Sequence, residues 1–123
     1  MKKILVAEDN LANRELMGEV LSGRGYDVIE ACDGQEALRK IEETNPDLVL
    51  LDIQLPLLDG FAVLQQIRQM PRFAKLRVVA VTANAMKEDR EKGAKAGFDA
   101  YISKPIDVAG LRAQVAELLS SAD

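Results

Sequence analysis

The chain has 123 residues, of which 48% are hydrophobic, and this size and composition suit one globular domain, so we expect a single domain spanning residues 1–123. Twenty Asp and Glu residues outnumber sixteen Lys and Arg residues, which gives a net charge of −4 without a basic cluster, so neither nucleic acid nor an anionic membrane is an expected partner. The apolar runs are far shorter than the roughly 20 residues of a membrane helix, and the N-terminus lacks the apolar core of a signal peptide, so the expected location is the cytoplasm.

The first quarter of the chain alternates between a strand pattern and a helix pattern. The apolar run at residues 3–7 predicts a strand, and the spacing of apolar residues predicts a helix over about 11–22. The sequence GRG at 23–25 stops this helix, and a second strand is expected at 26–30. These segments predict a strand, a helix and a second strand in succession.

The next helix and strand have clear boundary signals. Asp33 is a suitable N-cap for a helix that has to end near Asn45, because Pro46 disfavours helical geometry in the residue before it. The apolar residues 48–51 predict a buried third strand, and a carboxylate, Asp52, stands at its end. The position of this acid is a first indication of function.

The second half repeats the alternation of helices and strands. A helix opens at Asp59, and the run at 76–81 predicts a fourth strand. A helix is expected over about 84–96, a fifth strand at 99–102, and a last helix with apolar residues at spacings of three and four over 108–118. The whole chain therefore reads as five strand–helix units.

This (βα)₅ pattern predicts the α/β class. Continuous apolar strands that alternate with amphipathic helices form parallel sheets covered on both faces. Eight-unit barrels need about 250 residues, so we expect an open, doubly wound, five-stranded parallel sheet of the flavodoxin-like type. In its strand order 2-1-3-4-5, the first and third strands flank the crevice in which such folds bind ligands.

Reactive side chains stand at the ends of four of the five expected strands: Glu8 and Asp9, Asp52, Thr82 and Lys104. Because parallel strands point the same way, residues from distant positions in the sequence meet at one edge of the sheet. The chain has no histidine, which removes the commonest general base and most zinc sites. The single cysteine, Cys32, is expected to pack as a small residue.

The three acids of this set predict a bound cation. Taken singly, each residue is explained as a turn former, a helix cap or a solvated loop residue. Together, three carboxylates in one crevice repel one another, and their oxygen atoms suit Mg²⁺, which is the predicted cofactor. Asp52 would then stay ionised and nucleophilic, while Lys104 and Thr82 would supply positive charge and a hydrogen-bond donor. The predicted chemistry is in-line transfer of a phosphoryl group to Asp52.

Four segments, in this order and at these spacings, resemble the receiver domains of two-component response regulators. They are ILVAEDN, LVLLDIQLPLLDG, VVAVTANAM and DAYISKPI. The resemblance runs from Lys2 to about Leu119. The third segment is also similar to receivers attached to hybrid sensor kinases and to certain single-domain regulators, and we expect the stand-alone, single-domain type.

The resemblance implies a role for each residue of the metal site. Asp52 would be the phosphoacceptor and a metal ligand, and Asp9 would be the main carboxylate ligand of Mg²⁺. Glu8 would act largely through a metal-bound water, and the backbone carbonyl of Gln54 would complete the protein ligands. Such a protein would catalyse only its own phosphorylation and dephosphorylation.

The resemblance also implies how a signal would leave the site. Lys104 would pair with the phosphate, and a cis bond before Pro105 would aim this lysine into the crevice. Thr82 and Tyr101 would be the switch residues. A downstream protein would bind the face formed by the helix at 84–96, the fifth strand and the last helix. Since the chain has no histidine, a separate histidine kinase or histidine phosphotransfer protein would be the donor.

Three alternative functions fit the residues less well. A phosphatase of the haloacid-dehalogenase type would need a second Asp two positions after the nucleophile, where this chain has Gln54. A flavin- or nucleotide-binding module would need a glycine-rich loop, whereas residues 8–14 are EDNLANR. A receiver-like module that only binds proteins would not need the complete set of reactive residues.

Overall fold

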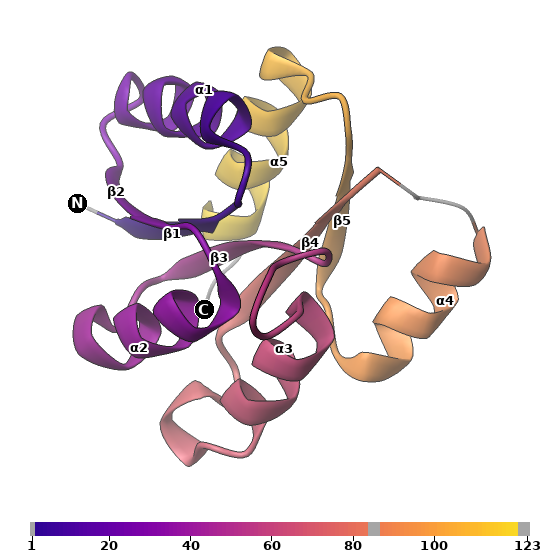
Figure 1. Cartoon of the computed structure of the whole chain (residues 1–123). Helices are drawn as coiled ribbons and strands as arrows, with labels where there is room; N and C mark the ends of the chain where they lie inside the picture. The colour runs from indigo at the N-terminus through magenta and orange to yellow at the C-terminus, as the bar shows by residue number, and fades with distance from the viewer. Residues whose placement is uncertain (1, 84–86, 121–123) are drawn as a thin grey trace.

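The computed structural model describes residues 2–83 and 87–120 as a five-stranded parallel sheet with helices on both faces (Figure 1). Part of the predicted fourth helix, residues 84–86, lies outside these ranges. The elements are β1 (Lys3–Ala7), α1 (Leu11–Ser22), β2 (Asp27–Ala31), α2 (Gly34–Thr44), β3 (Leu48–Asp52), α3 (Gly60–Arg68), the 3₁₀ helix η1 (Pro71–Phe73), β4 (Arg77–Thr82), α4 (Lys87–Ala96), β5 (Ala100–Ser103) and α5 (Val108–Ser120). None of the described helices is both long and apolar enough to span a membrane.

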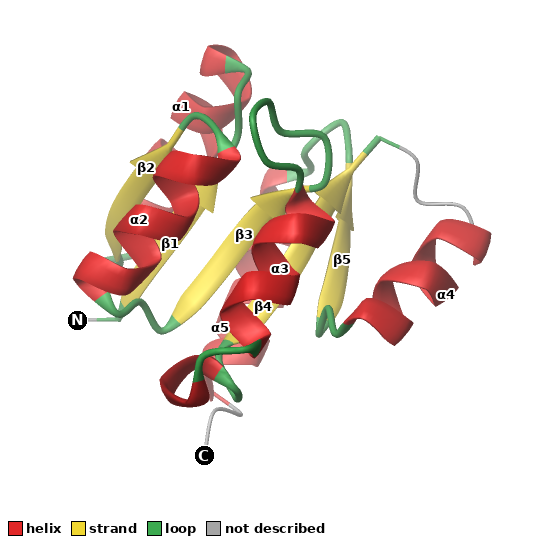
Figure 2. Ribbon diagram, turned by 60° about the horizontal axis from the view of Figure 1, so that its bottom comes forward, coloured by secondary structure: helices red, strands yellow, loops and turns green. Residues whose placement is uncertain are grey.

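The predicted topology is confirmed. The strand order is β2-β1-β3-β4-β5, and all neighbouring strands are parallel. Figure 2 shows that the arrowheads of the strands reach one common edge, where the loops gather. The carboxyl ends of β1 and β3 are adjacent there, which is the arrangement that the predicted order requires.

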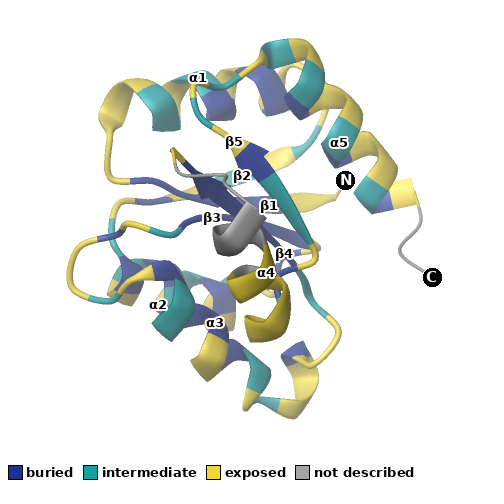
Figure 3. Ribbon diagram, turned by 90° about the vertical axis from the view of Figure 1, so that its right-hand side faces the viewer, coloured by how far each residue is buried: buried dark blue, intermediate teal, exposed yellow. Residues whose placement is uncertain are grey.

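The central strand β3 is buried on both faces. Successive side chains of a strand point to opposite faces, so Leu48 and Leu50 pack in the core beneath α1 and α5, while Val49 and Leu51 pack in the core beneath α2 and α3. Figure 3 shows the buried strands between helices whose outer surfaces are exposed. This two-sided burial explains why the strand is a continuous apolar run.

Polar residues set the helix ends much as the sequence predicts. Asp33 caps α2 by accepting a hydrogen bond from the Glu36 amide at 2.7 Å, and Asp59 caps α3 in the same way. Asn45 ends α2 with a left-handed backbone, φ 52°. The two N-caps fix where the loops at the carboxyl edge of the sheet end and the helices begin, whereas Asn45 lies at the opposite edge, before β3.

The structure corrects several details. Strands β2, β4 and β5 each begin and end one residue later than predicted, and η1 was not expected, because a single 3₁₀ turn leaves no periodic pattern in the sequence. The prediction that Cys32 packs inside is wrong, since this residue is exposed. Its position just after β2, at the edge of the sheet, places it outside both cores.

Candidate functional site

The ends of β1 and β3 bring three carboxylates together. Glu8 and Asp9 follow β1, Asp52 ends β3, and one oxygen atom from each lies within 4.8 Å of the others. Glu8 is fully buried and Asp52 is 3% exposed, whereas Asp9 is exposed to solvent. The three acids that the sequence predicts to meet are therefore adjacent, two of them inside the protein.

Lys104 closes the site from the loop after β5. Its Nζ atom lies 2.7 Å from Asp52 Oδ2 and 2.8 Å from Glu8 Oε1. The peptide bond to Pro105 is cis, and the side chain turns toward Asp52 and Glu8. Both parts of the prediction for this loop are confirmed. The ammonium group of Lys104 thus contacts two of the three acids.

The local backbone holds Asp52 in position. Its Oδ1 atom accepts a hydrogen bond from the Gln54 amide at 2.9 Å, which places the Gln54 main chain beside the carboxylate. Helix α3 begins directly beneath it, since a Cβ atom on Gly60 would lie only 2.7 Å from the Asp52 carbonyl oxygen. Glycine at position 60 therefore allows the helix to approach the end of β3 closely.

The acids are not fully compensated by the lysine. The pKa of Glu8 is raised to about 7, chiefly by burial and then by the neighbouring Asp52, and Lys104 only partly opposes this. Burial alone would lower the pKa of Lys104, but the nearby carboxylates of Asp52 and Glu8 outweigh burial and raise it. Glu8 Oε1 is buried and, despite its ion pair with Lys104, accepts no hydrogen bond of good geometry from the described residues. Such a set of oxygen atoms fits a hard divalent cation.

The raised pKa of Glu8 predicts how stability depends on pH in the absence of metal. Because the pKa of Glu8 is about 7 in the folded protein against an ordinary value of 4.5, the folded state binds the proton more tightly. The contribution of Glu8 to the free energy of unfolding is therefore fully present below pH 4.5 and is lost as the pH rises through 7. The loss is at most about 3 kcal/mol.

Urea unfolding in EDTA, measured near pH 5 and near pH 8, tests this expectation. The variant Glu8→Gln should lose this part of the pH dependence because it has no proton to release. If the free energies of unfolding of the parent and of Glu8→Gln fell equally between the two pH values, Glu8 would not be the group responsible for the pH dependence.

The two predicted switch residues lie on the neighbouring strands β4 and β5. Thr82 is the last residue of β4, is 6% exposed, and its carbonyl accepts a hydrogen bond from the Lys104 amide at 2.9 Å. Tyr101 of β5 is half-buried, and its ring centroid lies 6.3 Å from that of Phe98. Thr82 is thus tied to the lysine loop, and Tyr101 packs next to the end of α4.

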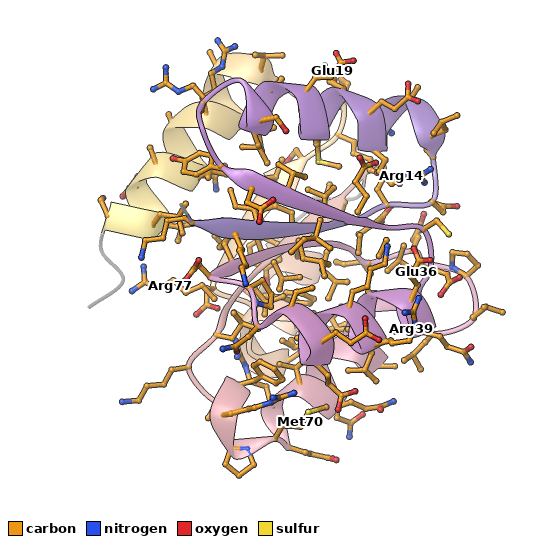
Figure 4. The ribbon with its side chains drawn as sticks, turned by 90° about the vertical axis from the view of Figure 1, so that its left-hand side faces the viewer. Arg14, Glu19, Glu36, Arg39, Met70 and Arg77 are labelled. Carbon is orange, nitrogen blue, oxygen red and sulfur yellow. The ribbon has the colours of Figure 1, made fainter. Side chains whose placement is uncertain are left out.

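Arg14 was not expected at the site from the sequence. Arg14 lies on α1 (Figure 4). Its Nη1 atom donates to the backbone carbonyl of Glu8 at 2.9 Å, and its Nε atom lies 3.2 Å from Glu30 Oε1. Glu30 is the next-to-last residue of β2. The only available signal was a basic residue shortly after the acid pair, which does not show whether its side chain turns to the site or to solvent.

Comparison with protein families gives one match over most of the chain. Residues 4–116 match the family model of the response regulator receiver domain. Among curated proteins, the polar-differentiation response regulator DivK of Brucella ovis is 41% identical over 107 residues, which cover 87% of each chain.

Solved structures show the same fold. The receiver domain of the sensor histidine kinase PA1611 of Pseudomonas aeruginosa, with a magnesium ion coordinated in its active-site cleft, is 34% identical, covers 98% of each chain and superposes with a TM-score of 0.89. The Vibrio cholerae chemotaxis protein CheY4 is 25% identical, with a TM-score of 0.92 over 97% of this chain and 99% of its own.

Proposed function

The chain belongs to the family of response regulator receiver domains, which act in two-component phosphorelays, and we propose that Asp52 is the residue on which it accepts the phosphoryl group. The observation that carries this proposal is the contact of Lys104 Nζ with Asp52 Oδ2 at 2.7 Å, beside two further acids. Asp52 is the member of the cluster that stands at the end of a fixed central strand. An oxygen atom held in this way can attack a phosphorus atom in line.

The transfer needs one nucleophile and one leaving group. A carboxylate oxygen of Asp52 forms a bond to phosphorus, while the bond from phosphorus to the donor's nitrogen or oxygen breaks on the opposite side. Lys104 then moves from the carboxylate toward the new phosphoryl oxygens, which carry more negative charge. We propose that the protein catalyses only this transfer and the later hydrolysis of its own acyl phosphate.

Glu8, Asp9 and Asp52 would hold the divalent cation, together with the backbone carbonyl of Gln54. The unfilled hydrogen-bonding capacity of buried Glu8 Oε1 and the exposure of Asp9 support this assignment. Mg²⁺, when bound, supplies positive charge to the phosphoryl oxygens during the transfer. Receiver domains bind Mg²⁺ at their acidic site, and the related PA1611 receiver holds it in its cleft.

The test of the proposed function is direct phosphorylation. Incubation with acetyl phosphate and Mg²⁺ should increase the intact mass by one phosphoryl group, and EDTA should prevent the increase. A protein that gains no phosphate under these conditions, while a known receiver treated in parallel does, would refute the proposal. Because the 123 residues contain no histidine, the biological phosphohistidine donor lies on a histidine kinase or a phosphotransfer protein.

The output of the site is proposed to be a change on the face of α4, β5 and α5. A new phosphoryl group adds negative charge and strong acceptor oxygens within reach of the Thr82 hydroxyl. Tyr101 borders a cavity of about 320 Å³ between β5 and α5, lined also by Gln114 and Leu111. Movement of Thr82 toward the phosphate would let Tyr101 change its rotamer and alter this face for a downstream protein.

The variant Thr82→Ala tests this coupling. It should still be phosphorylated on Asp52, because the nucleophile and the lysine remain, but the surface should respond less. Backbone NMR shift changes on phosphorylation should fall severalfold for residues 100–114 relative to the parent. Equally large changes in the variant would show that Thr82 is not the link.

A further inference from the structure

The contacts of Arg14 connect strand β2 with the acid pair after β1. Its side chain is only 17% exposed, although arginine is ordinarily a surface residue. One end of the guanidinium group bonds to the Glu8 carbonyl at 2.9 Å, and the Nε atom faces Glu30 at 3.2 Å. The guanidinium group reaches the two acceptors from two separate nitrogen atoms in a fixed plane, whereas a lysine has a single nitrogen at the end of a flexible stem.

The Glu8 carbonyl belongs to the same peptide unit as the Asp9 amide. Two other polar atoms of Glu8 are also bonded: its amide donates to the Ala31 carbonyl at 3.0 Å, and its Oε2 atom accepts from the Asn10 amide at 3.2 Å. Arg14 therefore supplies the remaining contact that fixes the plane of the Glu8–Asp9 peptide. A fixed peptide plane sets the direction in which both carboxylates leave the backbone.

Asp9 depends on this contact more than Glu8 does. Its carboxylate is exposed, and among the hydrogen bonds and ion pairs of the described residues none involves it. The position of the Asp9 carboxylate is therefore set by the two peptide groups that flank Asp9, and the Glu8–Asp9 peptide is one of them. A rotation of that peptide would displace the Asp9 carboxylate more than the Glu8 carboxylate.

We infer that Arg14 is a positioning residue of the metal site, which orients Asp9 and Glu8 for a divalent cation through the Glu8 carbonyl and is itself held by Glu30. The inference rests on the proposed function, since it assumes that these acids bind Mg²⁺. Groups that orient metal ligands without touching the metal commonly change its affinity by 10–100-fold. Arg14 would be such a group, because it contacts the Glu8 backbone carbonyl and not the metal.

The sign of the effect separates positioning from simple electrostatics. Arg14 is a positive charge close to a site for a cation, so as a charge alone it weakens Mg²⁺ binding. Its removal would then strengthen binding. As a positioning residue, Arg14 favours Mg²⁺ binding, so removal of Arg14 weakens the binding. The two roles therefore predict opposite results for the same substitution.

The experiment is a calorimetric titration of Mg²⁺ into the parent, Arg14→Met and Arg14→Lys. We expect about 10-fold weaker binding in Arg14→Met and a loss in the same direction in Arg14→Lys, which keeps the charge but not the fork. The matched control is Arg39→Met, which removes the same charge from an exposed position on α2, where Arg39 pairs only with Glu36 and Glu43 among the described residues. Unchanged or tighter binding in Arg14→Met would overturn the inference.

A second measurement needs no metal. Loss of the hydrogen bond should shift the backbone carbonyl carbon of Glu8 and the amide nitrogen of Asp9 in the NMR spectra of metal-free Arg14→Met, but not of Arg39→Met. Unchanged shifts at both atoms would also overturn the inference. If the parent itself bound no Mg²⁺ and gained no phosphate, the proposed function would fail instead, and these shifts would still decide whether Arg14 fixes the peptide.

Discussion

Asp52→Asn is expected to abolish the gain of phosphate from acetyl phosphate. Asparagine has nearly the same shape, so the strand end and the Gln54 amide contact should persist, but an amide oxygen is not a nucleophile for phosphorus. The neighbouring acids do not replace it. Glu8 is buried with a raised pKa, and Asp9 stands outside the contacts of Lys104. Intact-mass spectrometry should show less than about 1% of the parent's phosphorylation rate.

The control for this variant is Asp59→Asn. It makes the same chemical change at a helix cap, where asparagine serves as well as aspartate, and it should be phosphorylated like the parent. Unfolding curves of both variants would confirm that each is folded. Phosphate gained by Asp52→Asn at the parent's rate would assign the nucleophile to another residue.

Removal of Asp9 should have the second largest effect. Asp9→Ala deletes the exposed carboxylate that completes the cluster of three acids, and Mg²⁺ binding should weaken by at least about 100-fold. Phosphorylation should slow in parallel, because less of the protein carries the cation at any given concentration. Titration calorimetry and the mass assay measure the two effects independently.

Asp27→Ala is a matched control for the lost charge. Asp27 is exposed at the start of β2, at the opposite end of that strand from the site, so its removal should leave the Mg²⁺ affinity within about twofold of the parent. An Asp9→Ala protein with the parent's affinity would exclude Asp9 as a ligand. In that case Glu8 and Asp52 would have to hold the cation without it.

The parts of the fold that follow from burial could be predicted from the sequence. The run at 48–51 is apolar because β3 has a core on each face, and the same burial requires the polar Asp52 to stand at the strand end. Once the strand order is expected, the meeting of Asp52 with Glu8 and Lys104 follows from the parallel direction of the strands.

The remaining features depend on side-chain directions, which a sequence pattern does not contain. Arg14 is one basic residue on an amphipathic helix, and only the packing of α1 beside β2 turns it toward Glu30 and the Glu8 carbonyl. Cys32 has an apolar side chain but follows an edge strand, so no core covers it. Both depend on neighbours that are distant in the sequence.

The burial of β3 also bears on which motions the site tolerates. This strand pairs with β1 and β4 and has no exposed residue, so its amides should exchange with solvent only when the whole domain unfolds. Asp52 therefore stands on a segment that local opening elsewhere does not disturb, whereas described α4 residues such as Glu91 and Lys95 are exposed. If Asp52 is the phosphoacceptor and the α4 face is the output surface, as we propose, substitutions on that face would change the protein partner without loosening the strand that carries the acceptor.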